Sequence, residues 1–297
     1  MVQSKKEKAA DKVLTLLFIL LALFCVVPIL YILSASLSDE IQLTKEGYSL
    51  LPRGFSLEAY KYILESPKPI INAYGVTILV TLGGTAVSLL VTTMLAYVIA
   101  RKDFKVGRVF AFMIFFSMLF NGGLVPTYIM LTKYYHLKDT IWALIFPYII
   151  MPWHVFLMKG FLADIPTSLI EAAKIDGAGE VKTFFKIIVP ISKPALATVG
   201  LFIAFTYWND WYQSMLYIDD QRLYSLQALL NAIMTNVNML AQNAATMGAS
   251  MADTVANMPK EAARMAIVVV IVLPIACAYP FFQKYFISGL TVGAVKG

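Results

Sequence analysis

The sequence of 297 residues is too apolar for a soluble protein of this length. Hydrophobic residues make up 59% of the chain and charged residues only 14%, and the mean hydropathy is +0.72. These proportions exclude a soluble enzyme and a soluble nucleic-acid-binding protein. In a membrane chain the net charge of +6 reflects Lys and Arg residues whose positions along the topology indicate orientation, and no nucleic-acid partner is expected.

Six apolar runs are long enough to cross a hydrocarbon core of about 30 Å, which takes about 20 helical residues each. None shows the alternation of a barrel strand, so the sequence predicts an all-α polytopic protein with six transmembrane helices. The predicted spans cover residues 13–33, 73–100, 109–131, 140–158, 195–217 and 263–282. The expected organisation is an N-terminus at 1–12, a membrane domain at 13–283 with a long loop at 159–194, and a tail at 284–297.

Lysine and arginine residues concentrate on one side of this topology. Of the 24 in the chain, 15 lie in the N-terminus, the loops 101–108 and 159–194, and the C-terminal tail. An even number of spans places these four segments on one side, and short loops rich in Lys and Arg stay in the cytoplasm. Both termini are therefore expected to be cytoplasmic.

The loop between the fourth and fifth predicted spans should hold two short helices. Pro166 suits the first turn of the first helix, and Gly177 ends it. Four residues follow helical spacing and place two alanines on one face, where they open a shallow contact: Leu169, Ala172, Ala173 and Asp176. A second helix is predicted over 180–189, and Pro190 ends it.

These residues resemble the EAA motif of ABC-transporter permeases, in which Glu-Ala-Ala is followed by Gly and then by Ile-x-x-Pro. The matching residues are Glu171, Ala172, Ala173, Gly177, Ile187 and Pro190. Asp176 and Ala178 extend the match to the carbohydrate-importer branch, and the likeness continues into 207–211 and the tail 289–297. Within that branch the chain resembles MalG-like subunits, and the run 120–128 is similar to the LplC and YtcP oligosaccharide group.

The resemblance implies a type I ABC importer permease fold and a subunit without covalent chemistry of its own. Its implied partners are a second homologous permease subunit, two MalK-like ATPase subunits, an extracytoplasmic solute-binding protein and membrane lipid. Together they would import an oligosaccharide across a bacterial cytoplasmic membrane. The chain has no Gly-x-x-x-x-Gly-Lys-Ser/Thr loop, so ATP and Mg²⁺ are expected in the ATPase subunits, with no cofactor or metal bound here.

In such permeases the EAA loop is a coupling helix that sits in a cleft of an ATPase subunit and transmits its movement. The candidate coupling residues are Glu171, Ala172, Ala173, Asp176, Gly177, Ala178, Phe184 and Pro190. The resemblance also implies that the tail contacts the ATPases through Thr291, Gly293 and Ala294. From the residues alone, Glu171 could be a solvated charge, Gly177 a helix cap and the tail a frayed end.

Polar and aromatic residues within a span are candidates for the sugar pathway, because aromatic rings stack on sugars and amides bind hydroxyls. The candidates are Asn121, Tyr207, Trp208, Asn209 and Trp211. The aromatic residues fit an interfacial belt equally well, and Asp210 should face protein. Two glycine pairs, 83–84 and 122–123, should serve helix packing or bending rather than substrate contact.

Two other classes of function remain weaker alternatives. A secondary transporter would need coupling acids at mid-membrane depth, yet Asp210 is the one strong candidate in a predicted span. An intramembrane enzyme would need a serine or histidine with a partner at catalytic spacing, and none is evident. Among ABC importers, a polyol or glycerol phosphate could replace the oligosaccharide. Cys25 and Cys277 lie in apolar runs and are expected to be buried.

Overall fold

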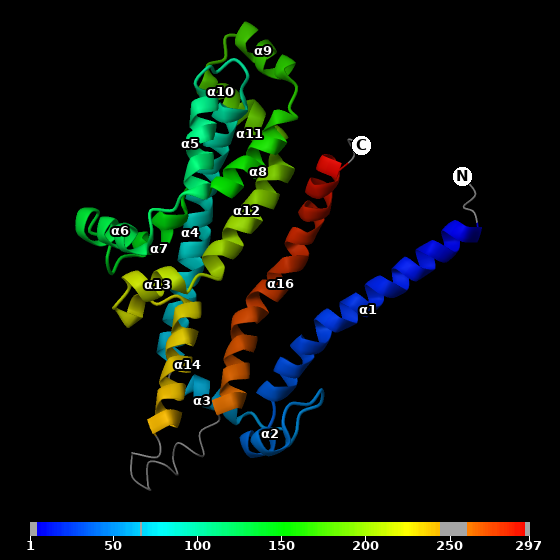
Figure 1. Cartoon of the computed structure of the whole chain (residues 1–297), viewed down its shortest axis with the longest axis vertical. Helices are drawn as coiled ribbons and strands as arrows, with labels where there is room; N and C mark the ends of the chain where they lie inside the picture. Colours follow the sequence, from blue (N-terminus) through cyan, green and yellow to red (C-terminus); the bar gives the residue numbers. More distant parts are fainter. Residues whose placement is uncertain (1–4, 66, 244–259, 295–297) are drawn as a thin grey trace. The chain divides into compact units, whose positions relative to one another are not determined.

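The computed structural model describes residues 5–65, 67–243 and 260–294, which form two compact units. The first unit comprises Met1–Pro67 with Ala232–Ile275, and the second comprises Lys68–Asn231 with Ala276–Gly297. The regular elements of the described residues are all helices (Figure 1), as the apolar runs predicted. The only extended pairing described is a single bridge between Ser38 and Phe55.

The first unit contains the first predicted span and the helices next to it. Its elements are α1 (Lys5–Ser36), α2 (Glu40–Glu46), α3 (Glu58–Leu64), most of α14 (Leu226–Asn243) and the first half of α16 (Lys260–Ala294). The Glu40 carboxylate accepts hydrogen bonds from the backbone N–H groups of Glu261 (3.1 Å) and Ala262 (2.9 Å). A carboxylate suits this position because the first N–H groups of a helix have no partner within it.

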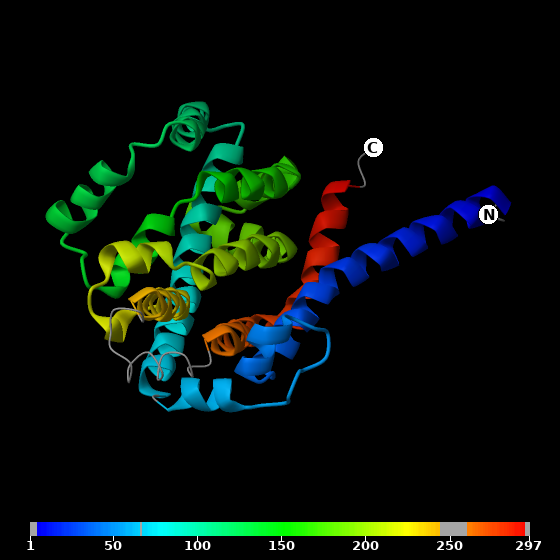
Figure 2. The same ribbon diagram turned by 60° about the horizontal axis from the view of Figure 1, so that its bottom comes forward.

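The second unit is built around α4 (Pro67–Ala100), with α5 (Gly107–Leu119), α8 (Pro152–Ala163) and α12 (Lys193–Trp208) alongside it. Figures 1 and 2 both show α8 and α12 side by side, and the side chains of Val155 and Val199 are fully buried in the core of this unit. Outside the 159–194 loop the unit also contains α6 (Leu124–Ile129), η1 (Met130–Tyr134), α7 (Ile141–Ile145), η2 (Phe146–Tyr148), α13 (Tyr212–Tyr217), η4 (Gln221–Leu223), the start of α14 and the second half of α16.

Gly84 allows α4 and α12 to approach closely. A Cβ atom on Gly84 would lie 2.7 Å from the ring of Tyr207, which is 2% exposed. The Tyr207 hydroxyl pairs with Ser88 Oγ at 2.7 Å and donates to the Ile145 carbonyl at 2.9 Å, so the ring is fixed in place. The expected packing role is confirmed for Gly84, whereas a Cβ atom on Gly83 would meet no atom within 4 Å.

The membrane-spanning helices are less regular than the six predicted runs. Among the described residues, Asp11–Ser36 and Pro67–Ala100 are each long and apolar enough to cross a membrane, and up to five spans result if each bent helix pair is one span. The predicted sixth span, 263–282, lies within α16, whose side chains from residue 281 onward are outside the described part.

The third predicted span, 109–131, is a bent helix pair. The chain bends by 113° between Gly107–Leu119 and Leu124–Tyr134. Gly123 adopts a φ of +92° at this bend, and Asn121 Oδ1 accepts a hydrogen bond from its N–H at 2.9 Å. Gly122 and Gly123 therefore serve the bending of the chain, and α5 alone covers only about 20 Å at 1.5 Å per residue.

The fourth and fifth predicted spans are also interrupted. Ile141–Tyr148 and Pro152–Ala163 meet at 52°, where Pro152 cannot donate a backbone hydrogen bond. The helix predicted over 195–217 ends at Trp208, and α13 begins at Tyr212. The break between them holds Asn209 and Asp210, whose side chains compete for backbone groups.

The two cysteines differ from expectation as well. Both Cys25 in α1 and Cys277 in α16 are exposed on the chain, not buried within it. Both lie in apolar helices, so lipid or a partner subunit would cover them in the membrane. No other described part of the chain shields either thiol, so both can react with a thiol-labelling reagent.

Candidate functional site

The 159–194 loop folds as two short helical segments, as its sequence predicted. The first is α9 (Thr167–Ile175), which lies at one end of the second unit (Figure 1), and the second runs through α10 (Glu180–Thr183), η3 (Phe184–Ile188) and α11 (Val189–Ile191). The second segment includes a π-helical turn at η3, which the sequence did not predict. Pro190 lies inside α11, and the helix then turns by 85° into α12.

Gly177 forms the turn between the two segments. Its φ of +72° is a left-handed conformation that residues with a side chain rarely adopt. The Gly177 N–H donates to the Lys174 carbonyl at 3.1 Å, and the Ala178 N–H donates to the Ala173 carbonyl at 2.9 Å. This pair of bonds is a Schellman motif, so Gly177 ends α9 and sets the direction of the chain toward α10.

The outer surface of this loop exposes large apolar side chains. Ile175 is 86% exposed at the end of α9, and Val181 is 72% exposed in α10. Ala173 is the one buried residue of α9, whereas Leu169 and Ala172 are exposed. Three of the four residues of the predicted face are therefore open to a partner, and exposed apolar groups are typical of a protein-binding surface.

Phe184 faces the membrane helices and not the outer surface of the loop. It is 5% exposed, and its ring lies 5.5 Å from the ring of Tyr97 near the end of α4. Phe184 was predicted as a coupling residue, and because its ring is buried it does not lie on the surface that a partner subunit can reach. Phe184 instead anchors η3 to α4, while Pro190 and Asp176 are exposed.

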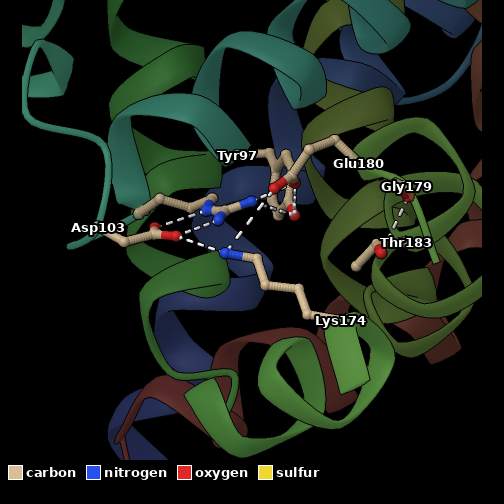
Figure 3. A network of polar contacts seen from close by, with 7 residues as sticks. Tyr97, Asp103, Lys174, Gly179, Glu180 and Thr183 are labelled. Atoms are coloured by element: carbon tan, nitrogen blue, oxygen red, sulfur yellow. Dashed lines mark hydrogen bonds and ion pairs between the residues drawn. The ribbon is translucent and has the colours of Figure 1, made fainter. Parts of the chain in front are cut away.

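A network of charged side chains also joins this loop to the end of α4 (Figure 3). Arg101, the first residue after α4, forms ion pairs with both Asp103 and Glu180. Lys174 of α9 donates to Asp103 at 2.9 Å and lies 3.9 Å from Glu180. Tyr97 completes the network by accepting a hydrogen bond from Arg101 at 3.1 Å and donating one to Glu180 at 3.2 Å.

The network keeps Asp103 ionised. Hydrogen bonds from Arg101 and then from Lys174 hold the pKa of the Asp103 carboxyl below its usual range. The hydrogen bond from Arg101 to Asp103 also raises the pKa of Arg101 further. The contacts of Arg101 could not be predicted from the sequence, because its network partners Lys174 and Glu180 lie more than 70 residues away and no local pattern links them to it.

Glu171 has a different environment from the residues of this network. It is exposed on α9 and forms no ion pair with any residue that the structure describes. It lines a cavity of about 660 Å³ whose walls come from the ends of α4 and α8 and from α9. Its carboxylate is therefore available to a partner molecule.

The predicted pathway residues separate into buried and exposed groups. Tyr207 is buried and its hydroxyl is fully used, so it cannot contact a solute in this conformation. Trp208 is partly buried, whereas Asn209 and Trp211 are exposed. Asp210 faces protein as expected, since it accepts a hydrogen bond from the Tyr148 hydroxyl at 2.8 Å.

Asn121 and the C-terminal residues complete the predicted set. Asn121 is exposed, and its side-chain oxygen is bonded to the turn at Gly123. Thr291, Gly293 and Ala294 continue α16, whose backbone is helical to Ala294. Their side chains, and the backbone of 295–297, lie outside the described residues, so their contact with ATPase subunits stays a prediction.

Comparison with known proteins identifies the family. Residues 92–292 match the profile described as "Binding-protein-dependent transport system inner membrane component". Protein LplC of Bacillus subtilis (strain 168) is 39% identical over 272 residues, covering 92% of this chain and 90% of that protein. The polygalacturonan/rhamnogalacturonan transport system permease protein YtcP of the same organism is 36% identical over 292 residues, covering 98% and 100%.

A solved structure is similar over the same extent. It is a bacterial ABC transporter involved in the import of the acidic polysaccharide alginate, and one of its chains matches with a TM-score of 0.80 and 28% identity, covering 96% of this chain and 99% of that chain. The match confirms the expected importer permease fold. The chain belongs to the family of binding-protein-dependent transport system inner membrane components, and its relatives are non-catalytic permease subunits of ABC transporters.

Proposed function

We propose that this chain is a permease subunit that imports an oligosaccharide and is driven by partner ATPase subunits bound at the α9–α11 loop. A solute-binding protein would deliver the sugar, and a second related permease subunit would complete the path. ATP and Mg²⁺ would be bound by the ATPase subunits. Both termini and the loop would face the cytoplasm, in agreement with the distribution of Lys and Arg.

The observation that carries this proposal is the exposed surface of the loop. Ile175 and Val181 would remain in water unless a partner covered them, and the exposed carboxylate of Glu171 has no ion pair among the described residues. Burying a large apolar side chain contributes about 1.5–3 kcal/mol, so two such side chains give a partner a substantial binding surface. The Schellman turn at Gly177 presents them in one fixed geometry.

The oligosaccharide cargo is supported by what the relatives are named for. YtcP is a polygalacturonan/rhamnogalacturonan permease, and the solved transporter is involved in import of alginate. A further relative, the trehalose/maltose permease MalG of Thermococcus litoralis, is 27% identical over 298 residues, covering 98% of this chain and 99% of that protein. A carbohydrate therefore fits better than a polyol or glycerol phosphate.

Photo-cross-linking from Ile175 tests where the ATPase binds. Cys25 and Cys277 are exposed, so both are first replaced by alanine, and a single cysteine at Ile175→Cys carries a maleimide-linked photo-cross-linker. Because Ile175 is exposed at the end of α9, we expect an adduct with an ATPase subunit in the assembled complex. The matched control is Leu51→Cys, which is 78% exposed in the segment before α3 and should give no such adduct. Absence of the Ile175 adduct in a complex that hydrolyses ATP contradicts the proposal.

Trp211 is the exposed aromatic residue best suited to the sugar path. Replacing it with alanine removes a stacking surface, and we expect the apparent KM for sugar uptake to rise about tenfold, the size of one lost ring contact. Basal ATP hydrolysis should not change. Trp142→Ala is the control, because Trp142 is similarly exposed in α7; equal effects of both variants would favour an interfacial belt instead.

A further inference from the structure

The helix α9 lies over a cavity, and only part of its surface packs against the core of the unit. The cavity of about 660 Å³ is lined by the end of α4, the end of α8 and by Ile170, Glu171 and Lys174 of α9. Ala173 is the one residue of α9 that is buried. Apolar contact with the core therefore comes from Ala173 and the partly buried Ile170, while the other residues of α9 are exposed.

Charged side chains make a second connection between this loop and the end of α4. The Arg101 guanidinium lies between two carboxylates that come from different segments, Asp103 after α4 and Glu180 of α10. Lys174 of α9 reaches the same two carboxylates. Both helical segments of the loop are thus tied to the residue that directly follows α4.

Arg101 is the central and best shielded member of this network. Its side chain is 11% exposed, compared with 52% for Asp103 and 58% for Glu180. Isolated surface ion pairs contribute little to stability. An arginine that binds a carboxylate with two nitrogen atoms makes a stronger interaction. Arg101 binds Asp103 through both Nε and Nη2, while Nη1 binds Glu180 and Tyr97.

A charge alone would not provide this geometry. Any cation at the end of α4 is favoured by the helix dipole, so a lysine at this position would keep that interaction. A lysine has one ammonium group and cannot bind both carboxylates with the planar arrangement of a guanidinium. The difference between arginine and lysine separates a geometric role from a purely electrostatic one.

We propose that Arg101 is a positioning residue that transmits movement of the α9–α10 loop to α4, through its simultaneous bonds to Asp103 and Glu180. The inference rests on the proposed function of the loop as the ATPase-binding element. When an ATPase subunit moves the loop, α9 can shift over the cavity while the ionic network carries the displacement to α4. Without the network, the apolar contacts of Phe184 with α4 remain, and we expect less of the loop's movement to reach the membrane helices.

The test measures sugar imported per ATP hydrolysed by the assembled complex in proteoliposomes. We expect Arg101→Met to lower this ratio about tenfold, as the loss of charge-assisted bonds suggests, while ATP hydrolysis and the KM for sugar stay close to wild type. Arg101→Lys should recover only part of the ratio. Lys102→Met is the matched control, because Lys102 is the exposed neighbour and forms no ion pair among the described residues.

Glu180→Gln provides a second variant that preserves size at a mostly exposed position. The double variant Arg101→Met/Glu180→Gln should be no worse than Arg101→Met alone, since both changes break the same link. A wild-type ratio in Arg101→Met, or full recovery in Arg101→Lys, overturns the proposal. If Arg101→Met is silent while the Ile175 cross-link to the ATPase forms, the loop function stands and only the role of Arg101 fails; if the cross-link is also absent, both fail.

Discussion

Replacing Gly177 with valine should abolish most sugar import while ATP hydrolysis continues. The φ of +72° at Gly177 costs a residue with a side chain about 1–2 kcal/mol, and a β-branched residue is especially disfavoured there. The turn would then relax and redirect α10 relative to α9. We expect at least a tenfold decrease in sugar imported per ATP, measured in proteoliposomes.

The effect of Gly177→Val should come from backbone strain at the positive φ and not from a steric clash of the new side chain. A Cβ atom on Gly177 would meet no atom within 4 Å, and the same is true of Gly179, which has a φ of −68°. Gly179→Ala is therefore a matched control that should behave as wild type. Gly177→Asn should be intermediate, because asparagine tolerates the left-handed conformation. Normal coupling in Gly177→Val would show that the turn geometry is not needed.

The second large effect is expected from Gly84→Ala, which places a methyl group against a fixed ring. The added Cβ atom would lie 2.7 Å from the Tyr207 ring, and that ring is held by Ser88 and Ile145. Because the ring cannot move away without losing its hydrogen bonds, α4 and α12 must separate. Overpacking of this kind costs about 1–3 kcal/mol, and the melting temperature of the purified complex should fall by several degrees.

Gly83 supplies the control for this prediction. It precedes Gly84 in the same helix, and a Cβ atom there would meet nothing within 4 Å. Gly83→Ala should therefore leave the melting temperature unchanged or raise it slightly, because alanine favours helix more than glycine does. Equal melting temperatures for the two variants would show that α4 and α12 do not pack as described.

The local sequence of the α9–α11 loop was sufficient to predict its first helix and the turn at Gly177, but not the π-helical turn at η3 or the position of Pro190 inside α11. Pro166, Gly177 and the helical spacing between them are signals within one short segment, and the structure has the predicted helix and turn. The sequence does not show which residue of α9 packs inward, because Ala172 and Ala173 are both small.

The breaks in the membrane helices could not be predicted from mean hydropathy. Residues 109–131 are apolar throughout, yet the chain turns by 113° where Gly123 adopts a positive φ. Hydropathy reports whether a segment prefers lipid, and it does not report the backbone angle at one glycine. The same limit applies before Pro152 and after Trp208.

Contacts between distant residues were beyond sequence reasoning. Arg101 and Glu180 lie 79 residues apart, and the Ser88–Tyr207 hydrogen bond joins residues 119 apart. Tyr207 was a candidate for the sugar pathway, with an interfacial belt as the equal alternative, and the sequence did not predict that it is a core residue. Only the packing of α4 against α12 shows that its ring and hydroxyl are enclosed.

ATPase activity of the assembled complex in nanodiscs, with its solute-binding protein and a panel of sugars, tests the central claim most directly. The panel includes neutral oligosaccharides, uronic-acid-containing oligosaccharides, a polyol and glycerol phosphate. The proposed function predicts that one class of oligosaccharide stimulates ATP hydrolysis and that the polyol and glycerol phosphate do not. Stimulation by the polyol or glycerol phosphate alone, or hydrolysis that no oligosaccharide changes, would contradict the assignment of a carbohydrate cargo.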